Sequence, residues 1–91
     1  MVKTRPAATP TPEMYDAYKH ADEQFTVASK GVDRLAYDAL TEQLFVTYIT
    51  GKVYCYTDVP ERVWEAFKSA GSKGTFVNAS IKPHYFCAGP L

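Results

Sequence analysis

The chain has 91 residues, a hydrophobic content of 46%, and ten basic and ten acidic side chains. This length allows one domain, and the hydrophobic content, with seven Tyr and five Phe, argues against a disordered chain. The zero net charge argues against a dedicated nucleic-acid binder, because such proteins usually carry a basic excess.

The charge is unevenly spread along the chain. Residues 1–51 carry five basic and seven acidic side chains, whereas residues 52–91 carry five basic and three acidic ones. An anion-facing surface is therefore expected in the C-terminal half. The N-terminus lacks the apolar run of a secretory signal, and no stretch is long enough to span a membrane. We expect a cytoplasmic protein, not associated with membranes, in which Cys55 and Cys87 are reduced thiols.

The N-terminal part predicts an arm followed by a helix. Residues 1–11 are rich in Pro, Thr and Ala, which predicts a flexible arm without a core contribution. Thr11 is a candidate N-cap and Pro12 fits the first helical position. Apolar residues then recur at helical spacing, which predicts an amphipathic helix over roughly 12–24, within an N-terminal extension that covers residues 12–26.

A three-stranded antiparallel meander is expected next. The first strand lies within residues 27–37, and Gly31 shortens it to about 32–37. Asp38 starts a turn, since its side chain can accept hydrogen bonds from the backbone that follows. The second strand covers 43–49 and the third covers 52–57, both rich in β-branched and aromatic residues.

The hairpin between the second and third strands has two possible registers. A two-residue turn at Thr50-Gly51 would place the two tyrosines of the third strand beside Thr47 and Phe45. A three-residue loop with Gly51 in the left-handed conformation is the preferred alternative. It collects apolar side chains on one face, which a slip by one residue would scatter. That face carries Leu44, Val46, Tyr48, Tyr54 and Tyr56.

The C-terminal part predicts helices that cover this face. Pro60 fits the first position of a helix over 60–70, which Gly71 ends as a left-handed cap. Ser72 can cap a shorter helix that stops before Pro83. The tail over residues 84–91 is expected to fray, and its last part, 87–91, is expected to lie outside the domain. The predicted fold class is therefore α+β, with the C-terminal helices on one face of the meander and the N-terminal helix on the other face or at an edge.

Residues 27–85 resemble the KTSC domain, a short bacterial module that also occurs at the C-terminus of some lysyl-tRNA synthetases. The order and spacing of several short pieces carry the resemblance, and a Tyr-x-Tyr pair is at their centre. The pieces are Ser29 with Val32, Leu35-Ala36-Tyr37-Asp38, Leu44-x-Val46-x-Tyr48, Gly51-x-Val53-Tyr54-x-Tyr56, Val59-Pro60, and Ser72-Lys73-Gly74-x-Phe76-x-Asn78-x-x-Ile81. The corresponding domain would cover residues 27–86.

We expect a small non-enzymatic binding module. The link to a tRNA synthetase implies RNA as the partner, by analogy of association. Many members of the family are small stand-alone proteins of bacteria and phages, so the alternative is a protein-interaction module, such as a phage-encoded modulator of a host protein. Cys55 stands where many members have a polar or charged residue, which removes one possible phosphate contact.

Candidate nucleic-acid contacts lie in the C-terminal half. Lys73 is the leading candidate, because it begins a predicted helix beside Ser72 and Gly74. Further candidate contacts are Lys82, Lys68 and Arg62. Five further residues of the resemblance are expected to be structural; these are Tyr54, Tyr56, Gly51, Pro60 and Asn78. The two tyrosines could stack bases, but we expect them in the core, and Asn78 is expected to tie the last helix to the sheet.

No catalytic or metal-binding pattern stands out. His20 and His84 are far from each other and from Cys55 and Cys87 in the sequence, without the short paired spacing of a zinc site. Neither histidine is near a Ser or Cys in a recognisable catalytic arrangement. We therefore expect no catalytic residues, no metal, no cofactor and no small-molecule substrate.

Overall fold

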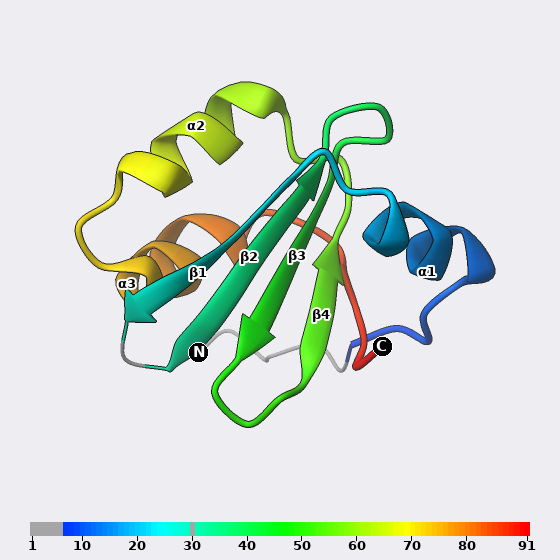
Figure 1. The fold of residues 1–91 in the computed structure, drawn as a ribbon, viewed down its shortest axis with the longest axis horizontal. Helices are drawn as coiled ribbons and strands as arrows, with labels where there is room; N and C mark the ends of the chain where they lie inside the picture. Colours follow the sequence, from blue (N-terminus) through cyan, green and yellow to red (C-terminus); the bar gives the residue numbers. More distant parts are fainter. Residues whose placement is uncertain (1–6, 30) are drawn as a thin grey trace.

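A sheet of five antiparallel strands, arranged in the order of the sequence, forms the centre of the protein (Figure 1). The computed structural model describes residues 7–29 and 31–91. The strands are β1 (Glu23–Ser29), β2 (Val32–Asp38), β3 (Gln43–Tyr48), β4 (Val53–Tyr56) and β5 (Cys87–Ala88). The helical elements are α1 (Pro12–Lys19), α2 (Glu61–Ser69), α3 (Lys73–Phe76) and the π-helical turn η1 (Val77–Ile81).

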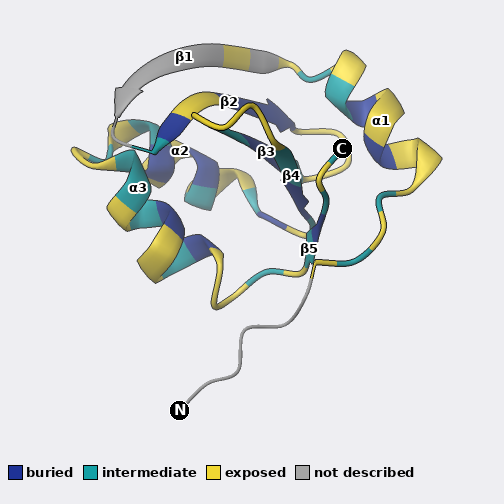
Figure 2. Ribbon diagram, turned by 90° about the horizontal axis from the view of Figure 1, so that it is seen from below, coloured by how far each residue is buried: buried dark blue, intermediate teal, exposed yellow. Residues whose placement is uncertain are grey.

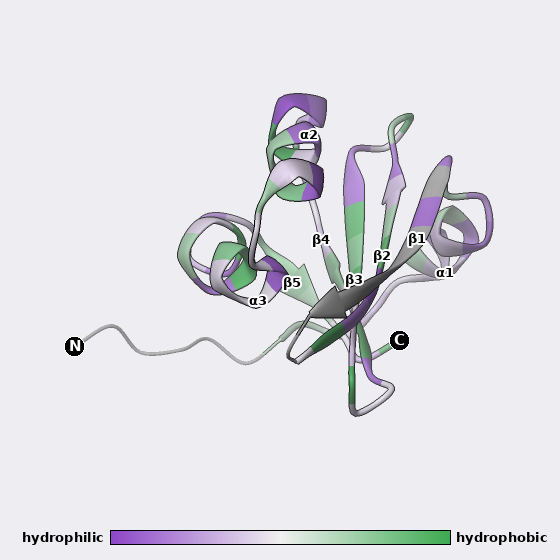
Figure 3. Ribbon diagram, turned by 60° about the vertical axis from the view of Figure 1, so that its left-hand side comes forward, coloured by the Kyte–Doolittle hydropathy of each residue, from purple (hydrophilic) through white to green (hydrophobic). Residues whose placement is uncertain are grey.

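The elements form three layers. Figure 3 shows α2 and α3 on one side of the sheet and α1 on the other, and Figure 2 shows the buried residues between these layers. The larger core cluster lies under α2, α3 and η1, and a smaller cluster lies under α1. The α+β class and the meander with C-terminal helices on one face are therefore confirmed, but the sheet has two strands more than predicted.

The additional strand β1 replaces part of the predicted N-terminal helix. Thr11 caps α1 as predicted, since its hydroxyl oxygen accepts a hydrogen bond from the Met14 N–H at 3.3 Å. The helix ends at Lys19, however, and residues 23–26 pair with β2 instead. The predicted helical extension over 12–26 is thus wrong in its second half. Strand pairing along β2 outweighs the weak helical periodicity of a segment that contains Phe25-Thr26-Val27.

Two turns of the meander form as predicted. Asp38 accepts hydrogen bonds from the Leu40 N–H at 3.2 Å and from the Thr41 hydroxyl at 2.7 Å, which closes the turn between β2 and β3. Gly51 has φ 89°, the left-handed conformation of the preferred three-residue loop. The resulting register pairs Val46 with Tyr54 and Leu44 with Tyr56.

Both ends of the described chain are better ordered than predicted. Cys87 and Ala88 form β5 beside β4, and the Leu91 N–H donates to the Val53 carbonyl at 2.8 Å. Ala8 closes the outer edge of β5, because its N–H donates to the Cys87 carbonyl at 3.0 Å and its carbonyl accepts from the Gly89 N–H at 2.9 Å. The prediction of a frayed tail is therefore wrong, and Ala8 contradicts the prediction that the arm makes no contribution to the core. Residues 1–6 of the arm lie outside the described residues.

The boundaries of α2 differ slightly from the prediction. Pro60 is the N-cap and has extended backbone, so the helix begins one residue later, at Glu61. Gly71 does not have the left-handed conformation expected of a cap; the helix ends at Ser69, and its C-cap residue Ala70 has extended backbone. Ser72 caps α3 as predicted, with its oxygen accepting from the Thr75 N–H at 3.2 Å.

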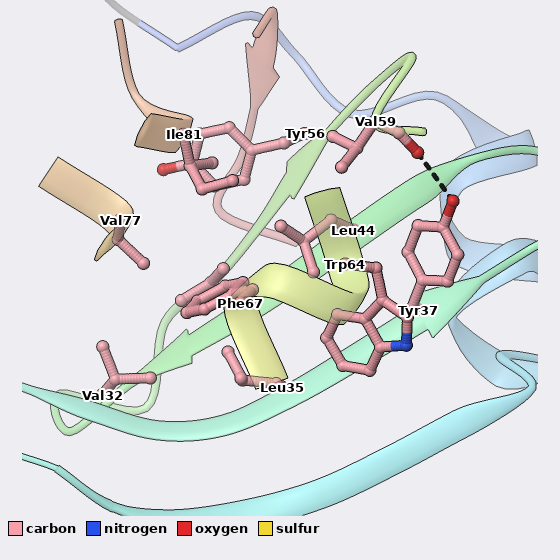
Figure 4. Packing of buried hydrophobic residues seen from close by; sticks show 11 residues of the cluster. Val32, Leu35, Tyr37, Leu44, Tyr56, Val59, Trp64, Phe67, Val77 and Ile81 are labelled. Atoms are coloured by element: carbon pink, nitrogen blue, oxygen red, sulfur yellow. Dashed lines mark hydrogen bonds between the residues drawn. The ribbon is translucent and has the colours of Figure 1, made fainter. Parts of the chain in front are cut away.

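The larger core cluster is built around Trp64 of α2, which is fully buried (Figure 4). The ring of Tyr37 stacks on the indole with a centroid distance of 5.2 Å and an interplanar angle of 13°. The Tyr37 hydroxyl donates to the Val59 carbonyl at 2.7 Å, which joins β2 to the segment that leads into α2. Phe67 meets the indole edge-on at 6.4 Å. Such aromatic pairs add to the area they bury, so this cluster fixes α2 against the sheet.

The first prediction concerns Tyr56, whose side chain is only 2% exposed in this cluster. Changing Tyr56 to Ala should lower the free energy of unfolding by about 3–5 kcal/mol, because the truncation leaves a cavity. Urea unfolding measures the change. Tyr15→Ala is the matched control, since Tyr15 is 46% exposed and its loss should have a small effect. Equal stability of the two variants would contradict this packing.

The second prediction concerns stability at alkaline pH. The pKa of Tyr37 is raised from 10.0 to about 12, first by burial and then by the negative charges of Glu42 and Glu61. Above about pH 10 the unfolded state therefore loses the phenolic proton while the folded state keeps it. The free energy of unfolding should fall as the pH rises from about 10 to about 12. Below about pH 10, Tyr37 makes its full contribution to the free energy of unfolding.

Urea unfolding across this pH window tests the effect. Tyr37→Phe should show a shallower decline than the wild type, whereas Tyr15→Phe, with an exposed ring, should not. The other buried tyrosines contribute to the decline in all three proteins. The test therefore compares the slope of the free energy of unfolding against pH between each variant and the wild type. The same slope in Tyr37→Phe and the wild type would be inconsistent with a raised Tyr37 pKa.

Candidate functional site

The two tyrosines of the Tyr-x-Tyr pair have different environments. Tyr56 is buried, and its hydroxyl shares a hydrogen bond of 3.1 Å with the hydroxyl of Tyr48. Tyr54 is half-buried and meets the Tyr48 ring edge-on at 5.7 Å. Gly89 approaches the Tyr54 ring so closely that a Cβ atom at this position would lie 2.5 Å from the ring carbon Cδ1. Tyr56 is therefore a core residue, whereas Tyr48 and Tyr54 lie at the border between core and surface.

The segment 72–74 has a structural role in the described fold. Lys73 turns its ammonium group back to the end of α2, where it donates to the carbonyls of Lys68 at 2.8 Å and Ala70 at 2.5 Å. These are carbonyls that the last turn of a helix leaves unpaired, and a cation there also complements the helix dipole. The Ser72 hydroxyl hydrogen-bonds to the N–H and the hydroxyl of Thr75, and Gly74 lies within α3. In this geometry Lys73 caps the C-terminal end of α2, and its ammonium group is not directed at a ligand as the leading RNA contact would be.

The other basic candidates are distributed over two regions. Lys68 forms an ion pair of 3.0 Å with Glu65 and lies over the Trp64 ring at 5.4 Å. Arg62 is exposed on α2, next to Glu61 in the sequence. Lys82 is exposed and lies elsewhere, after η1, with its ammonium nitrogen 5.6 Å from the centre of the Tyr48 ring. Of the predicted contacts, only Lys82 lies beside the half-buried tyrosines.

Lys52 also lies at this end of the sheet, although the sequence analysis did not select it as a candidate contact. The Tyr48 N–H donates to the Lys52 carbonyl at 2.9 Å, so the two residues are opposite each other at the β3–β4 turn. Side chains alternate along a strand, which puts Lys52 on the same face as Tyr54. We call Tyr48, Tyr54, Lys52 and Lys82 the hairpin-end surface. The alternation of residues 52, 54 and 56 was the available signal for Lys52.

Acidic side chains gather at the opposite end of the sheet. Asp38, Glu42 and Glu61 all raise the pKa of Tyr37, which places their charges near its ring. By contrast, residues 43–57 and 66–91, which build the hairpin-end surface, contain no Asp or Glu. β3 has six residues and therefore separates the two ends by about 17 Å. The zero net charge thus conceals a separation of charge along the strands.

Histidine and cysteine side chains do not gather into a site in the described part of the chain. His20 pairs with Asp16 at 3.6 Å on the surface, and His84 is exposed. Cys55 packs in the cluster under α1, whereas Cys87 packs against the cluster on the other face of the sheet. Burial raises the pKa of Cys55 to about 12, which keeps its thiol protonated and unreactive.

The described residues contain no metal-binding cluster and no helix suited to a membrane. No group of three His, Cys, Asp or Glu side chains within residues 7–29 and 31–91 could hold a metal ion. No helix in this part of the chain has the length and apolar composition needed to cross a membrane. Asn78 is exposed on η1. Its predicted role of tying the last helix to the sheet stays a prediction.

The third prediction concerns Lys73 as a helix cap. Lys73→Met keeps most of the stem but removes the donors, so the free energy of unfolding should fall by about 1 kcal/mol. Arg62→Met is the matched control, because it removes an exposed positive charge from α2, and it should change stability by less than about 0.5 kcal/mol. Thermal melting measures both. A Lys73→Met protein as stable as the wild type would show that the two hydrogen bonds contribute little.

Comparisons with known proteins give one consistent family. The KTSC domain model matches residues 28–85. A protein of Tsukamurella paurometabola is 32% identical over 59 residues, which are 65% of this chain and 88% of that protein. The crystal structure of a KTSC domain protein from Yersinia pestis has a TM-score of 0.68 and 32% identity, and the match covers 71% of this chain and 92% of that one. With its meander and its C-terminal helices, the chain belongs to the KTSC domain family.

Proposed function

We propose that this protein is a non-enzymatic module that binds RNA through the hairpin-end surface. The observation that carries the proposal is the separation of charge. Lys52 and Lys82 lie beside half-buried tyrosines at one end of the sheet, while Asp38, Glu42 and Glu61 gather at the other. Phosphate groups would be attracted to the first end and repelled by the second, which orients an RNA on the protein.

Two further considerations support RNA as the partner. Nucleic-acid affinity depends on local basic patches, so a zero net charge does not oppose it when the charges are separated. The occurrence of the family in lysyl-tRNA synthetases associates it with an RNA substrate, which is an analogy and not a property of this site. We also propose that the protein works in the cytoplasm, where its two free cysteines would stay reduced.

A protein partner is the second candidate, and one observation favours it. Four large hydrophobic side chains are exposed in the described part of the chain, with Leu40 at 90% and Ile49 at 70%. Leu40 lies in the turn between β2 and β3, at the acidic end of the sheet. Ile49, by contrast, lies in the β3–β4 turn, so exposed apolar side chains occur at both ends of the sheet. A pull-down with and without nuclease treatment separates the two candidate functions, since only an RNA-dependent complex is lost on digestion.

The fourth prediction concerns the charges of the hairpin-end surface. The double variant Lys52→Gln with Lys82→Gln should bind RNA more weakly irrespective of sequence, and the salt dependence should become shallower by about one unit per lost contact. Fluorescence polarisation with a labelled RNA at several salt concentrations measures both effects. Both lysines are exposed, so the fold should be unaffected.

Lys19→Gln with Arg62→Gln is the matched control for this test. It removes two positive charges from α1 and α2, outside the hairpin-end surface, and should leave both the affinity and the salt dependence close to those of the wild type. Equal losses in the two double variants would point to diffuse attraction and contradict this surface. A wild type without affinity for RNA at low salt would refute RNA binding and leave the protein partner as the better candidate.

A further inference from the structure

We infer that the hairpin-end surface takes unpaired nucleotides, with a base stacked on the Tyr48 ring and the neighbouring phosphates held by Lys52 and Lys82. This inference rests on the proposed RNA binding and specifies its ligand. Aromatic side chains can stack only on bases that are free of a partner, whereas a duplex offers mainly its backbone and shape. A surface with half-buried rings and only two lysines therefore suits a single strand better than a duplex.

Tyr48 is the ring best placed for stacking. Tyr56 is only 2% exposed, and Gly89 covers one side of the Tyr54 ring. The Tyr48 ring is half-buried, and the group over its face is the ammonium of Lys82, 5.6 Å from the ring centre. Lys82 itself is exposed, so its flexible side chain can leave the ring when a base arrives and move to a phosphate. The cation would thus exchange one favourable contact for another.

Contacts within the protein fix the position of the Tyr48 ring before a ligand binds. Its hydroxyl shares a hydrogen bond with the Tyr56 hydroxyl, and the Tyr54 ring packs on it edge-on. Both contacts come from β4, the strand that pairs with β3 and follows Lys52. A ring that is fixed before binding loses little conformational entropy when it binds, which favours affinity.

One acidic residue lies close to this end of the sheet. Asp33 follows Val32, the residue of β2 that pairs with Tyr48. It is exposed, at an irregularity of the strand between Val32 and Arg34. The charge of the neighbouring Arg34 is of opposite sign, so the pair adds no net charge to this part of the strand. The lysines of the hairpin-end surface therefore determine its sign.

Two Tyr48 variants and two RNAs test the inference. Tyr48→Leu removes the aromatic face, whereas Tyr48→Phe keeps the face and removes only the hydroxyl. The probes are a labelled single-stranded oligouridylate and a labelled RNA hairpin with the same number of phosphates. We expect the wild type to prefer the single strand. Tyr48→Leu should bind the single strand about tenfold or more weakly, as lost base stacking predicts, and Tyr48→Phe should bind it nearly as well as the wild type.

Each outcome distinguishes the inference from the proposed function. A wild type that binds both RNAs equally, with Tyr48→Leu unchanged, overturns the inference and leaves RNA binding intact. A wild type that binds neither RNA refutes the proposed function itself. If Tyr48→Leu fails to fold, ultraviolet crosslinking of the wild type to the single strand decides instead. A crosslinked peptide that contains Tyr48 or Tyr54 supports the inference, and crosslinks confined to other peptides contradict it.

Discussion

The register of the β3–β4 hairpin is the constraint on which the rest of the structure depends. Gly51, with φ 89°, allows the three-residue loop that pairs Leu44 with Tyr56 and Val46 with Tyr54. Because side chains alternate along strands, a shift of β4 by one residue would turn Tyr54 and Tyr56 away from the face that carries Leu44 and Val46. The core under α2 would then lose side chains that the sheet contributes to it.

The same register explains why the hairpin end differs from the core. Near the middle of the sheet, the side chains of this face are covered by Trp64 and Phe67 and become fully buried. Toward the β3–β4 turn, the cover of α2 ends, and Tyr48 and Tyr54 are left half-buried with Lys52 and Lys82 around them. A continuous row of apolar and aromatic residues thus runs from a structural core to a candidate binding surface.

Local chemistry made part of this fold predictable from sequence. The cap at Thr11, the turn at Asp38 and the loop at Gly51 depend on a few neighbouring residues, and all three form as expected. The strands β1 and β5 were missed, because they form by pairing with β2 and β4, and the sequence of a strand does not show which other segments will pair with it. β5 has two residues, Cys87 and Ala88, which is too short for any periodicity.

The candidate site was predictable only in part, for a similar reason. Lys82 was selected because it is basic and in the C-terminal half, but its position over Tyr48 requires the packing of η1 on the sheet. Lys73 has the same charge and a more suggestive local sequence, yet its ammonium group binds the end of α2. Which of two lysines faces solvent depends on contacts between elements, and a single sequence does not display these.

The central claim is that the basic end of the sheet is the binding surface, and NMR tests it most directly. Short single-stranded RNA would be titrated at low salt into the isotope-labelled wild-type protein, and the amide shifts would be followed residue by residue. The account predicts changes concentrated at residues 48–54 and 82–89, with α1 and the N-terminal half of α2 nearly unchanged. Shifts concentrated at the acidic end, around Leu40 and Glu61, or no shifts at all, would contradict it.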